Sequence, residues 1–269
     1  MSAIAGCGLH TGAAGSVRFV LHEGPVVVHA GGIDVALGDL HVVDTSRSTT
    51  VANASGSVRI ATVEHVFAAL GGLGIHAGVA VIIEGREPPL ADGAARAYAD
   101  ALRALGPALR SSPPPLRVAR AGVVEIGASR YELACADAVD LEVVIDFDDE
   151  RIAPSACWAG DAEDFRARIA TARTFGFEHE VGDLLARGLA SHVTPESVVV
   201  IGRDRVLAAG AAFTSDEPAR HKLLDLIGDL YLYGGPPRGR LRATRPGHAA
   251  THEVMHRALA EGLVVRDAR

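Results

Sequence analysis

Cysteine and aromatic residues are scarce in this 269-residue chain, which has three cysteines, one tryptophan and only 4% aromatic residues. Cys7, Cys135 and Cys157 lie far apart and form no Cys-x-x-Cys pair, which excludes a disulfide framework and a cysteine-ligated zinc site. We expect these three side chains to be buried as small apolar residues. With so few aromatic residues, the core must be built from Val, Leu, Ile and Ala.

Positive charge and long apolar runs are also lacking. The formal net charge of −7 argues against the basic stripe of a nucleic-acid-binding surface. No apolar run approaches the roughly 18 residues that span a bilayer, and the N-terminus lacks the basic and apolar regions of a signal peptide. We therefore expect a cytoplasmic monomer that is not an integral membrane protein, binds no nucleic acid and acts on a small molecule.

The composition of the chain, 48% hydrophobic and 22% charged, is typical of a globular protein and excludes an intrinsically disordered one. At roughly 150 residues a domain, the length suggests about two domains. Three consecutive prolines at 113–115 force an extended path between two patterned regions. We place the domain boundary there, which predicts domains of residues 1–111 and 112–269.

Hydrophobic periodicity and turn residues predict strands and helices in both halves. In the first half the predicted elements are strands at 16–22, 26–29, 46–52 and 79–83 and helices at 62–73 and 94–105. In the second half they are strands at 117–126, 131–135, 141–147, 197–201 and 239–244 and helices at 161–172, 218–233 and 249–261. Thr62 is the predicted cap of the first helix, and the strand at 79–83 is apolar enough to be covered on both faces. The second half repeats the order of the first in outline, which predicts an α+β fold.

Metal-ligating and acid-base residues gather in three places along the chain. His221 and Asp225 are four residues apart on a predicted helix, so their side chains share one face and lie about 5 to 6 Å apart at Cβ. One ion could be held by both, and His65 could supply a third ligand, with Glu64 beside it to act on a bound water. Three protein ligands with an open fourth position are typical of a catalytic zinc.

The same spacing also has a simpler interpretation. A His and an Asp at this spacing often form only a surface pair worth a few tenths of a kcal/mol, about 0.2 to 0.5. Twelve histidines make chance pairings common. By default Lys222 and Asp229 would be solvated charges, and His248 would follow a turn glycine in a loop. From spacing alone both interpretations stay open.

The motifs together resemble one enzyme family, the UDP-3-O-acyl-N-acetylglucosamine deacetylases, which are zinc amidases of lipid A biosynthesis. The resemblance runs through residues 6–12, 60–65, 68–75, 172–177, 220–230 and 247–248. The stretch Arg-His-Lys-Leu-Leu-Asp-Leu-Ile-Gly-Asp-Leu at 220–230 is the most specific, because it matches many positions at once.

Carried over position by position, the resemblance implies a Zn²⁺ site. The implied ligands are His65, His221 and Asp225. Glu64 would be the general base for the metal-bound water, and His248 the general acid that protonates the leaving amine. Asp229 would orient His248 and keep it protonated. The implied reaction is hydrolysis of a linear amide to acetate and an amine.

The resemblance also implies residues around the reacting group. Lys222 and Thr174 would lie near the developing oxyanion, Phe175 beside the acyl path and Arg245 near the phosphates of a UDP-sugar. The implied fold has two similar-sized α+β domains, each with helices layered on a mostly antiparallel sheet, and the active site lies between them.

Several positions depart from the family pattern. His76 and Ala77 replace the usual Asp-Asn, residues 191–197 replace a Gly-Gly-Ser-x-Asp-Asn-Ala stretch, and Val143 stands where an aromatic is expected. Metal and acid-base positions are all retained. This favours a divergent paralogue that deacetylates the usual acylated UDP-sugar or another N-acetylated sugar. The alternative from another class is a non-catalytic homologue that binds a sugar nucleotide.

Overall fold

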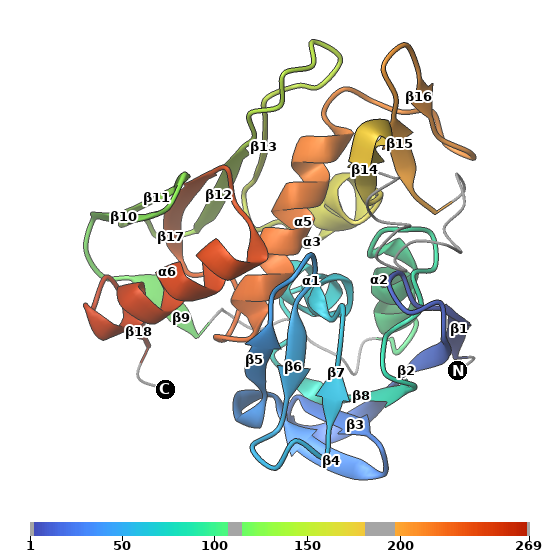
Figure 1. Ribbon diagram of the computed structural model, residues 1–269. Coiled ribbons are helices and arrows are strands. Elements are labelled where there is room, and N and C mark those ends of the chain that lie inside the picture. Colours follow the sequence, from blue (N-terminus) through green and yellow to red (C-terminus); the bar gives the residue numbers. More distant parts are fainter. Residues whose placement is uncertain (1–2, 107–114, 181–196, 268–269) are drawn as a thin grey trace.

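The computed structural model describes residues 3–106, 115–180 and 197–267. Its architecture is α+β, as expected, with two five-stranded sheets and the main helices between them (Figure 1). The predicted domain boundary at 111/112 and all but the last residue of 191–197 lie outside the described residues. The division into domains 1–111 and 112–269 therefore stays a prediction.

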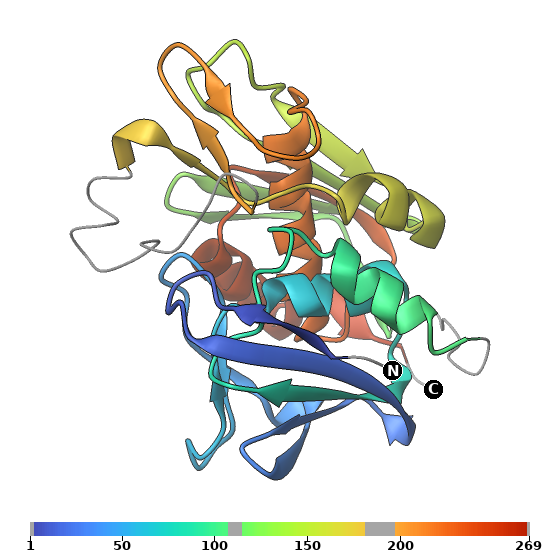
Figure 2. The ribbon, with the colours of Figure 1, turned by 90° about the vertical axis from the view of Figure 1, so that its right-hand side faces the viewer.

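The first sheet lies in the N-terminal half and has one parallel pair, β3 with β8. Its strands in spatial order are β1 (Ile4–Cys7), β2 (Ala14–Pro25), β8 (Ala77–Glu84), β3 (Val27–Ala30) and β4 (Ile33–Ala36). Along β8 fully buried residues alternate with half-buried ones, so the expectation that this strand is covered on both faces is wrong. The reason is that α1 and α2 lie on only one side of the sheet (Figure 2).

The second sheet repeats the strand order of the first. Its strands in spatial order are β10 (Gly122–Ile126), β11 (Ser129–Ala134), β17 (Gly239–Thr244), β12 (Val139–Val144) and β13 (Ser155–Trp158). Again only one pair, β12 with β17, is parallel. In each of these two sheets the strand that comes last in the sequence lies in the middle, between the second and third strands.

The main helices occupy equivalent positions in the element order of the two halves. A helix precedes the central strand in each half and another follows it: α1 (Glu64–Gly72), α2 (Arg96–Arg103), α5 (Glu217–Tyr231) and α6 (His248–Ala260). A short helix, α3 (Ala162–Asp164), continues into a π-helical turn, η2 (Phe165–Ile169). Figure 2 shows the helices stacked between the two sheets.

The central contact of the molecule is α1 against α5. Every residue of α5 except Lys222 is buried. A Cβ on Gly228 would lie only 2.0 Å from the carbonyl oxygen of Glu64, so glycine is what lets the first turn of α1 reach α5. This close approach sets Glu64 and His65 opposite the middle of α5.

Smaller sheets flank this helix pair. Their strands are β5 (His41–Asp44), β6 (Thr50–Ala52) and β7 (Arg59–Ile60) in one sheet, β14 (Phe175–Phe177), β15 (Val199–Ile201) and β16 (Val206–Leu207) in a second, and β9 (Leu116–Val118) and β18 (Val264–Arg266) in a third. The 3₁₀ turn η1 (Leu37–Asp39) follows β4. The strand predicted at 117–126 is thus two strands, β9 and β10, that belong to different sheets.

Two local expectations are wrong. Thr62 does not cap α1: the cap position is Val63, and Thr62 has a left-handed φ of 54° with its hydroxyl donating to Glu87 at 2.8 Å. The three cysteines are exposed, not buried. Cys157, for example, points outward from β13 while its neighbour Trp158 points into the core.

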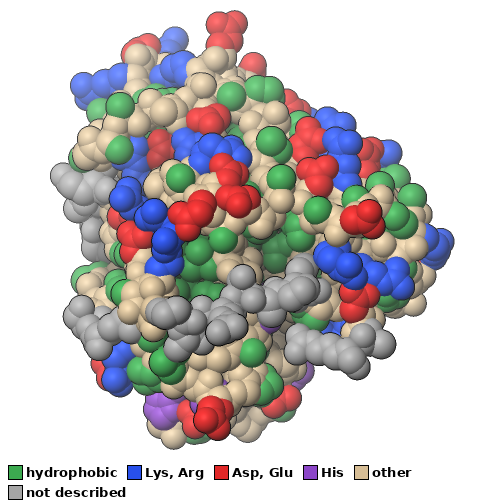
Figure 3. All heavy atoms as spheres, turned by 180° about the vertical axis from the view of Figure 1, so that it is seen from behind, with side chains coloured by type: hydrophobic (Ala, Val, Ile, Leu, Met, Phe, Trp, Pro, Cys, Tyr) green, Lys and Arg blue, Asp and Glu red, His purple; other side chains and the backbone are tan. Residues whose placement is uncertain are grey.

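The surface carries both signs of charge. Figure 3, the view from behind, shows acidic and basic side chains interspersed across that face. Many basic residues are paired, as Arg168 is with Asp164 at 2.9 Å. Among the helices of the described residues, none is long and apolar enough to cross a membrane.

Candidate active site

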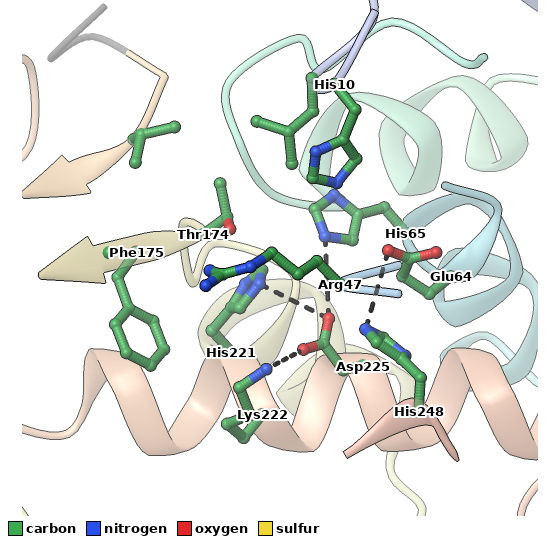
Figure 4. A pocket seen from close by; sticks show the side chains of 13 residues that line it. His10, Arg47, Glu64, His65, Thr174, Phe175, His221, Lys222, Asp225 and His248 are labelled. Carbon is green, nitrogen blue, oxygen red and sulfur yellow. Dashed lines mark hydrogen bonds and ion pairs between the residues drawn. The ribbon is translucent and has the colours of Figure 1, made fainter. Parts of the chain in front are cut away.

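A cavity of about 230 Å³ opens between α1, α5 and the start of α6 (Figure 4). Most of the residues singled out from the sequence line it. The lining consists of Leu9, His10, Arg47, Glu64, His65, Thr174, Phe175, Gly176, Val198, His221, Lys222, Asp225 and His248. Side chains from both halves of the chain therefore meet in one pocket.

Three buried side chains in this pocket converge as metal ligands would. One ligand atom from each of His65, His221 and Asp225 lies within 4.8 Å of the others. The Nε2 atoms of His65 and His221 are 3.8 and 3.5 Å from Asp225 Oδ1. His221 Nδ1 lies 3.0 Å from the Ala172 carbonyl oxygen, which can only accept, so Nδ1 carries the hydrogen and Nε2 keeps its lone pair. Two imidazoles and a carboxylate fit a catalytic metal site.

The electrostatics also suit metal binding, which requires deprotonated ligands. Burial, assisted by the neighbouring His221, lowers the pKa of His65 to about 3. Burial likewise lowers the pKa of His221. Burial opposes the charged form of Asp225, but Lys222 and the histidines outweigh it and hold the pKa of that carboxyl well below its usual range. At neutral pH the two imidazoles are therefore neutral and the carboxylate is ionised.

Glu64 and His248 face each other across the pocket, with Glu64 Oε1 4.0 Å from His248 Nε2. Burial raises the pKa of Glu64 to about 8 despite the opposing effect of His248. His248 is the first residue of α6, and its Nδ1 lies 2.8 Å from Asp229 Oδ2. Burial disfavours the imidazolium, but the charge and hydrogen bond of Asp229 outweigh it and raise the pKa of His248 to about 9. The pocket thus pairs a carboxyl group with a histidine that holds its proton at neutral pH.

The other residues singled out from the sequence divide into two groups. Thr174, Phe175 and Lys222 line the cavity, and Lys222 Nζ donates to Asp225 Oδ2 at 2.7 Å and lies 6.0 Å from the centre of the Phe175 ring. Asp229 stands behind His248 and does not line the cavity. Arg245 does not line it either, and its half-exposed guanidinium pairs with Asp146.

Sequence reasoning did not assign His10 and Arg47, although both line the cavity. His10 stands inside the matched motif at 6–12, so that motif was the available signal. Arg47 has a left-handed φ of 69°, and no local pattern marks it as a pocket residue. Its position depends on where the loop between β5 and β6 lies.

Val143, which stands where the family pattern has an aromatic residue, does not lie at the site. Val143 is fully buried in the core, so this position cannot stack against a base. The exposed aromatic of the same region is Phe147, which packs on Phe175 and Phe177 with ring centres 5.7 and 5.1 Å apart. A loss of aromatic contact surface at Val143 is therefore no argument for a changed substrate.

Comparison with known proteins shows the family of this chain. A family model described as UDP-3-O-acyl N-acetylglycosamine deacetylase matches residues 1–260. Proteins named UDP-3-O-acyl-N-acetylglucosamine deacetylase are 37% identical in Phenylobacterium zucineum (strain HLK1) and 33% identical in Myxococcus xanthus (strain DK1622). These matches cover 95% and 97% of this chain and 89% and 85% of the two relatives, respectively. With a matching family model over nearly its whole length, the chain belongs to the UDP-3-O-acyl-N-acetylglucosamine deacetylase family.

Proposed function

We propose that this protein is a zinc-dependent deacetylase that hydrolyses the acetamide of a UDP-3-O-acyl-N-acetylglucosamine-like sugar nucleotide and releases acetate. The observation that carries the proposal is the convergence of His65, His221 and Asp225 beside Glu64 and His248 in one buried pocket. The names of the relatives describe the same reaction. Zinc is the metal that the donor set of two imidazoles and one carboxylate favours for hydrolysis.

His65, His221 and Asp225 would hold the zinc. When bound, zinc polarises a carbonyl group and lowers the pKa of water toward about 7. Glu64 takes the proton from the attacking water oxygen as that oxygen bonds to the acetyl carbon. His248 Nε2 gives its proton to the nitrogen as the carbon–nitrogen bond breaks, which leaves acetate and a free amine. Lys222 Nζ and the Thr174 hydroxyl stabilise the negative charge that develops on the acetyl oxygen.

The wall of the pocket suits the rest of this substrate. Phe175, with Phe147 and Phe177 beside it, forms an apolar surface next to the reacting groups, which favours an acyl chain or a flat ring. Arg245 lies farther out, where its guanidinium could exchange Asp146 for a phosphate. An apolar surface at the pocket and a half-exposed guanidinium outside it support a substrate that extends from the pocket toward the surface.

The non-catalytic alternative has little support. A protein that only binds a sugar nucleotide has no use for a buried carboxyl and a protonated histidine 4.0 Å apart beside three metal-ligand side chains. Burying such groups is costly unless they are paired or bind a metal. Their joint retention favours catalysis.

The test combines a metal measurement with a substrate panel. Purified protein is analysed for zinc and assayed for acetate release from the 3-O-acylated UDP-N-acetylglucosamine, its non-acylated counterpart and a free N-acetylated sugar. We expect one zinc per chain and acetate release from at least one UDP-sugar. Preference for the acylated compound would assign the usual family substrate, and preference for another sugar would assign the divergent one. Zinc-loaded protein inactive on the whole panel would contradict the proposal.

A further inference from the structure

Asp229 has more hydrogen-bond partners than the orientation of His248 requires. One carboxylate oxygen, Oδ2, accepts from His248 Nδ1 at 2.8 Å. The other, Oδ1, accepts from the Thr49 hydroxyl at 2.6 Å and lies 3.4 Å from His252 Nε2. Thr49, Asp229 and His252 are all buried, with 0, 1 and 4% of their surface exposed.

The donors and acceptors in this group form one directional chain. Because the single Thr49 hydroxyl hydrogen goes to Asp229, its oxygen accepts from His252 Nε2, which lies 3.1 Å away. His252 Nδ1 then keeps a lone pair and accepts from the Tyr233 hydroxyl at 3.0 Å. Tyr233 in turn lies 3.4 Å from Nε2 of the exposed His256. The chain runs from the surface of α6 to Asp229.

Thr49 also contacts Glu64, the other member of the proposed acid-base pair. Its backbone N–H donates to Glu64 Oε2 at 3.0 Å. Thr49 is therefore bonded to the carboxyl group that takes a proton and to the carboxylate that orients the histidine that gives one. From the loop before β6, Thr49 therefore joins Glu64 of α1 to Asp229 of α5.

We propose that Thr49, His252 and Tyr233 are positioning residues, whose hydrogen bonds fix the rotation of the Asp229 carboxylate and through it the ring orientation of His248. A carboxylate held by one partner can rotate, whereas one held on both oxygens presents Oδ2 to His248 in a single direction. The inference rests on the proposed function, because it concerns the residue that would protonate the leaving amine.

The charged groups around His248 determine how the hydrogen bonds of Thr49 and His252 would affect the pKa of His248. His248 is faced by Asp229, Asp225 and Lys222 from α5 and by Glu64 from α1, and His252 follows it on α6. Thr49 donates to Asp229 and so shares the negative charge of its carboxylate. Removing this hydrogen bond concentrates that charge on His248, so the alkaline limb of the pH profile should move to higher pH.

The first experiment compares Thr49→Val with Thr49→Ser in the zinc-loaded enzyme. Valine keeps the buried β-branched shape but lacks the hydroxyl, and serine restores the hydroxyl. We expect Thr49→Val to lower kcat about tenfold or more with little change in KM, and Thr49→Ser to stay within about threefold of the unmodified protein. Nitrogen-15 NMR of His248 supplies a readout independent of activity, because the Nδ1–H signal should shift in the valine variant only. Equal kcat and an unchanged signal in Thr49→Val would overturn the proposal.

The second experiment uses α6 and separates positioning from proton conduction. In His252→Gln the amide nitrogen reaches the place of Nε2 and still donates to Thr49, whereas in His252→Asn it reaches only the place of Nδ1. We expect the asparagine variant to lose activity as Thr49→Val does and the glutamine variant to retain most of it. His256 lies at the exposed end of the hydrogen-bond chain, and His256→Asn should leave the activity unchanged. Equal loss in the two His252 variants would show that only packing matters.

Failure of this inference differs from failure of the proposed function. If Glu64→Gln and His248→Gln abolish acetate release while Thr49→Val does not, only the positioning role is wrong. If Glu64→Gln and His248→Gln remain fully active, the acid-base assignment itself is wrong.

Discussion

At the scale of single residues, the proposed chemistry depends on burial more than on residue type. In the metal-free protein, burial raises the pKa of Glu64 and the pairing with Asp229 raises the pKa of His248. A bound Zn²⁺ beside Glu64 would favour its ionised form, which is the form that can accept a proton. His65 and His221 stay neutral because they are buried. Three predictions follow from these environments, one for the metal, one for the base and one for the acid.

His221→Ala should remove the metal. The variant loses one of three converging ligands. Loss of a residue that only hydrogen-bonds to a metal ligand typically costs about tenfold to a hundredfold in metal affinity, so loss of the ligand itself should cost at least as much. Zinc content after dialysis, measured by mass spectrometry, checks this, with His22→Ala on the exposed part of β2 as the control. A variant that retains one zinc per chain would mean that the ion binds elsewhere.

Glu64→Gln should keep the metal but lose most of the rate. General acid-base groups contribute about 10² to 10⁴-fold to the rate, so kcat should decrease by a factor in that range. Folding should not suffer in the metal-free protein, because burial raises the pKa of Glu64 to about 8 and the neutral amide replaces a largely protonated carboxyl at pH 7. Steady-state kinetics and thermal melts test both points, with the exposed Glu84→Gln as the control for lost charge. Undiminished kcat would assign the base to another group.

Activity should decline as the pH rises through about 9, because the pKa of His248 is raised to about 9 and only its protonated form can donate to the leaving nitrogen. In Asp229→Asn the charge that supports the imidazolium is gone, so the alkaline limb should move to lower pH and the maximum rate should fall. The measurement is kcat/KM against pH, and its limbs belong to the coupled site as a whole. An alkaline limb that stays in place in Asp229→Asn would show that another group controls it.

At the scale of elements, the packing of α1 on α5 creates the site. α5 carries two of the proposed metal ligands and Asp229, and the first turn of α1 carries the third proposed ligand and Glu64. Gly228 permits that approach, since no larger residue fits between its backbone and the carbonyl of Glu64. The helix contact therefore links stability and metal binding.

Gly228→Ala should damage both properties. In an exposed helix this substitution would stabilise, but here the added methyl group must push α1 from α5, at a cost typical of overpacking, about 1 to 3 kcal/mol. Zinc affinity should fall as well, because His65 moves away from His221 and Asp225. Denaturant titration and metal titration provide the data, with Gly38→Ala, where a Cβ meets no atom within 4 Å, as the control. A stabilised variant with normal zinc affinity would contradict this account.

At the scale of the whole molecule, one topology occurs twice and the site lies where the two copies meet. Both five-stranded sheets have the same strand order, and α1 and α5 are equivalent helices that precede their central strands. The two copies differ in the number and position of proposed metal ligands on these helices. His65 is in the first turn of α1, whereas His221 and Asp225 are in the interior of α5.

If residues 1–111 and 112–269 form the two domains that we predict, neither alone should bind zinc with high affinity, because neither has all three ligands. Produced together as separate chains, they should associate through α1 and α5 and bind one zinc. Co-purification with metal analysis tests this. Tight zinc binding by either segment alone would contradict a site shared between the halves.

Local sequence patterns predicted much of the fold. The long helix α5, the strands β2, β3, β11, β12 and β17 and the helices α1, α2 and α6 are near their expected places, because each has a strong apolar period that acts over a few residues. The short strands β1 and β4 lie at sheet edges, where most side chains are exposed and the apolar period is weak. The edge strand β13 alternates exposed and buried residues but has only four residues. Local patterns therefore do not predict these three strands.

The sequence motifs indicated the kind of chemistry through their resemblance to the deacetylase family, because the spacing of His221 and Asp225 alone is compatible with a surface pair as well as with a metal site. Only the tertiary structure decided which of twelve histidines share a pocket and which of them keep a proton. Thr49 and His252 illustrate the difference, since nothing near them in the chain points to Asp229. Spacing along a helix is local, whereas convergence and burial depend on how distant helices pack, and it is burial that sets the pKa values on which the reaction depends.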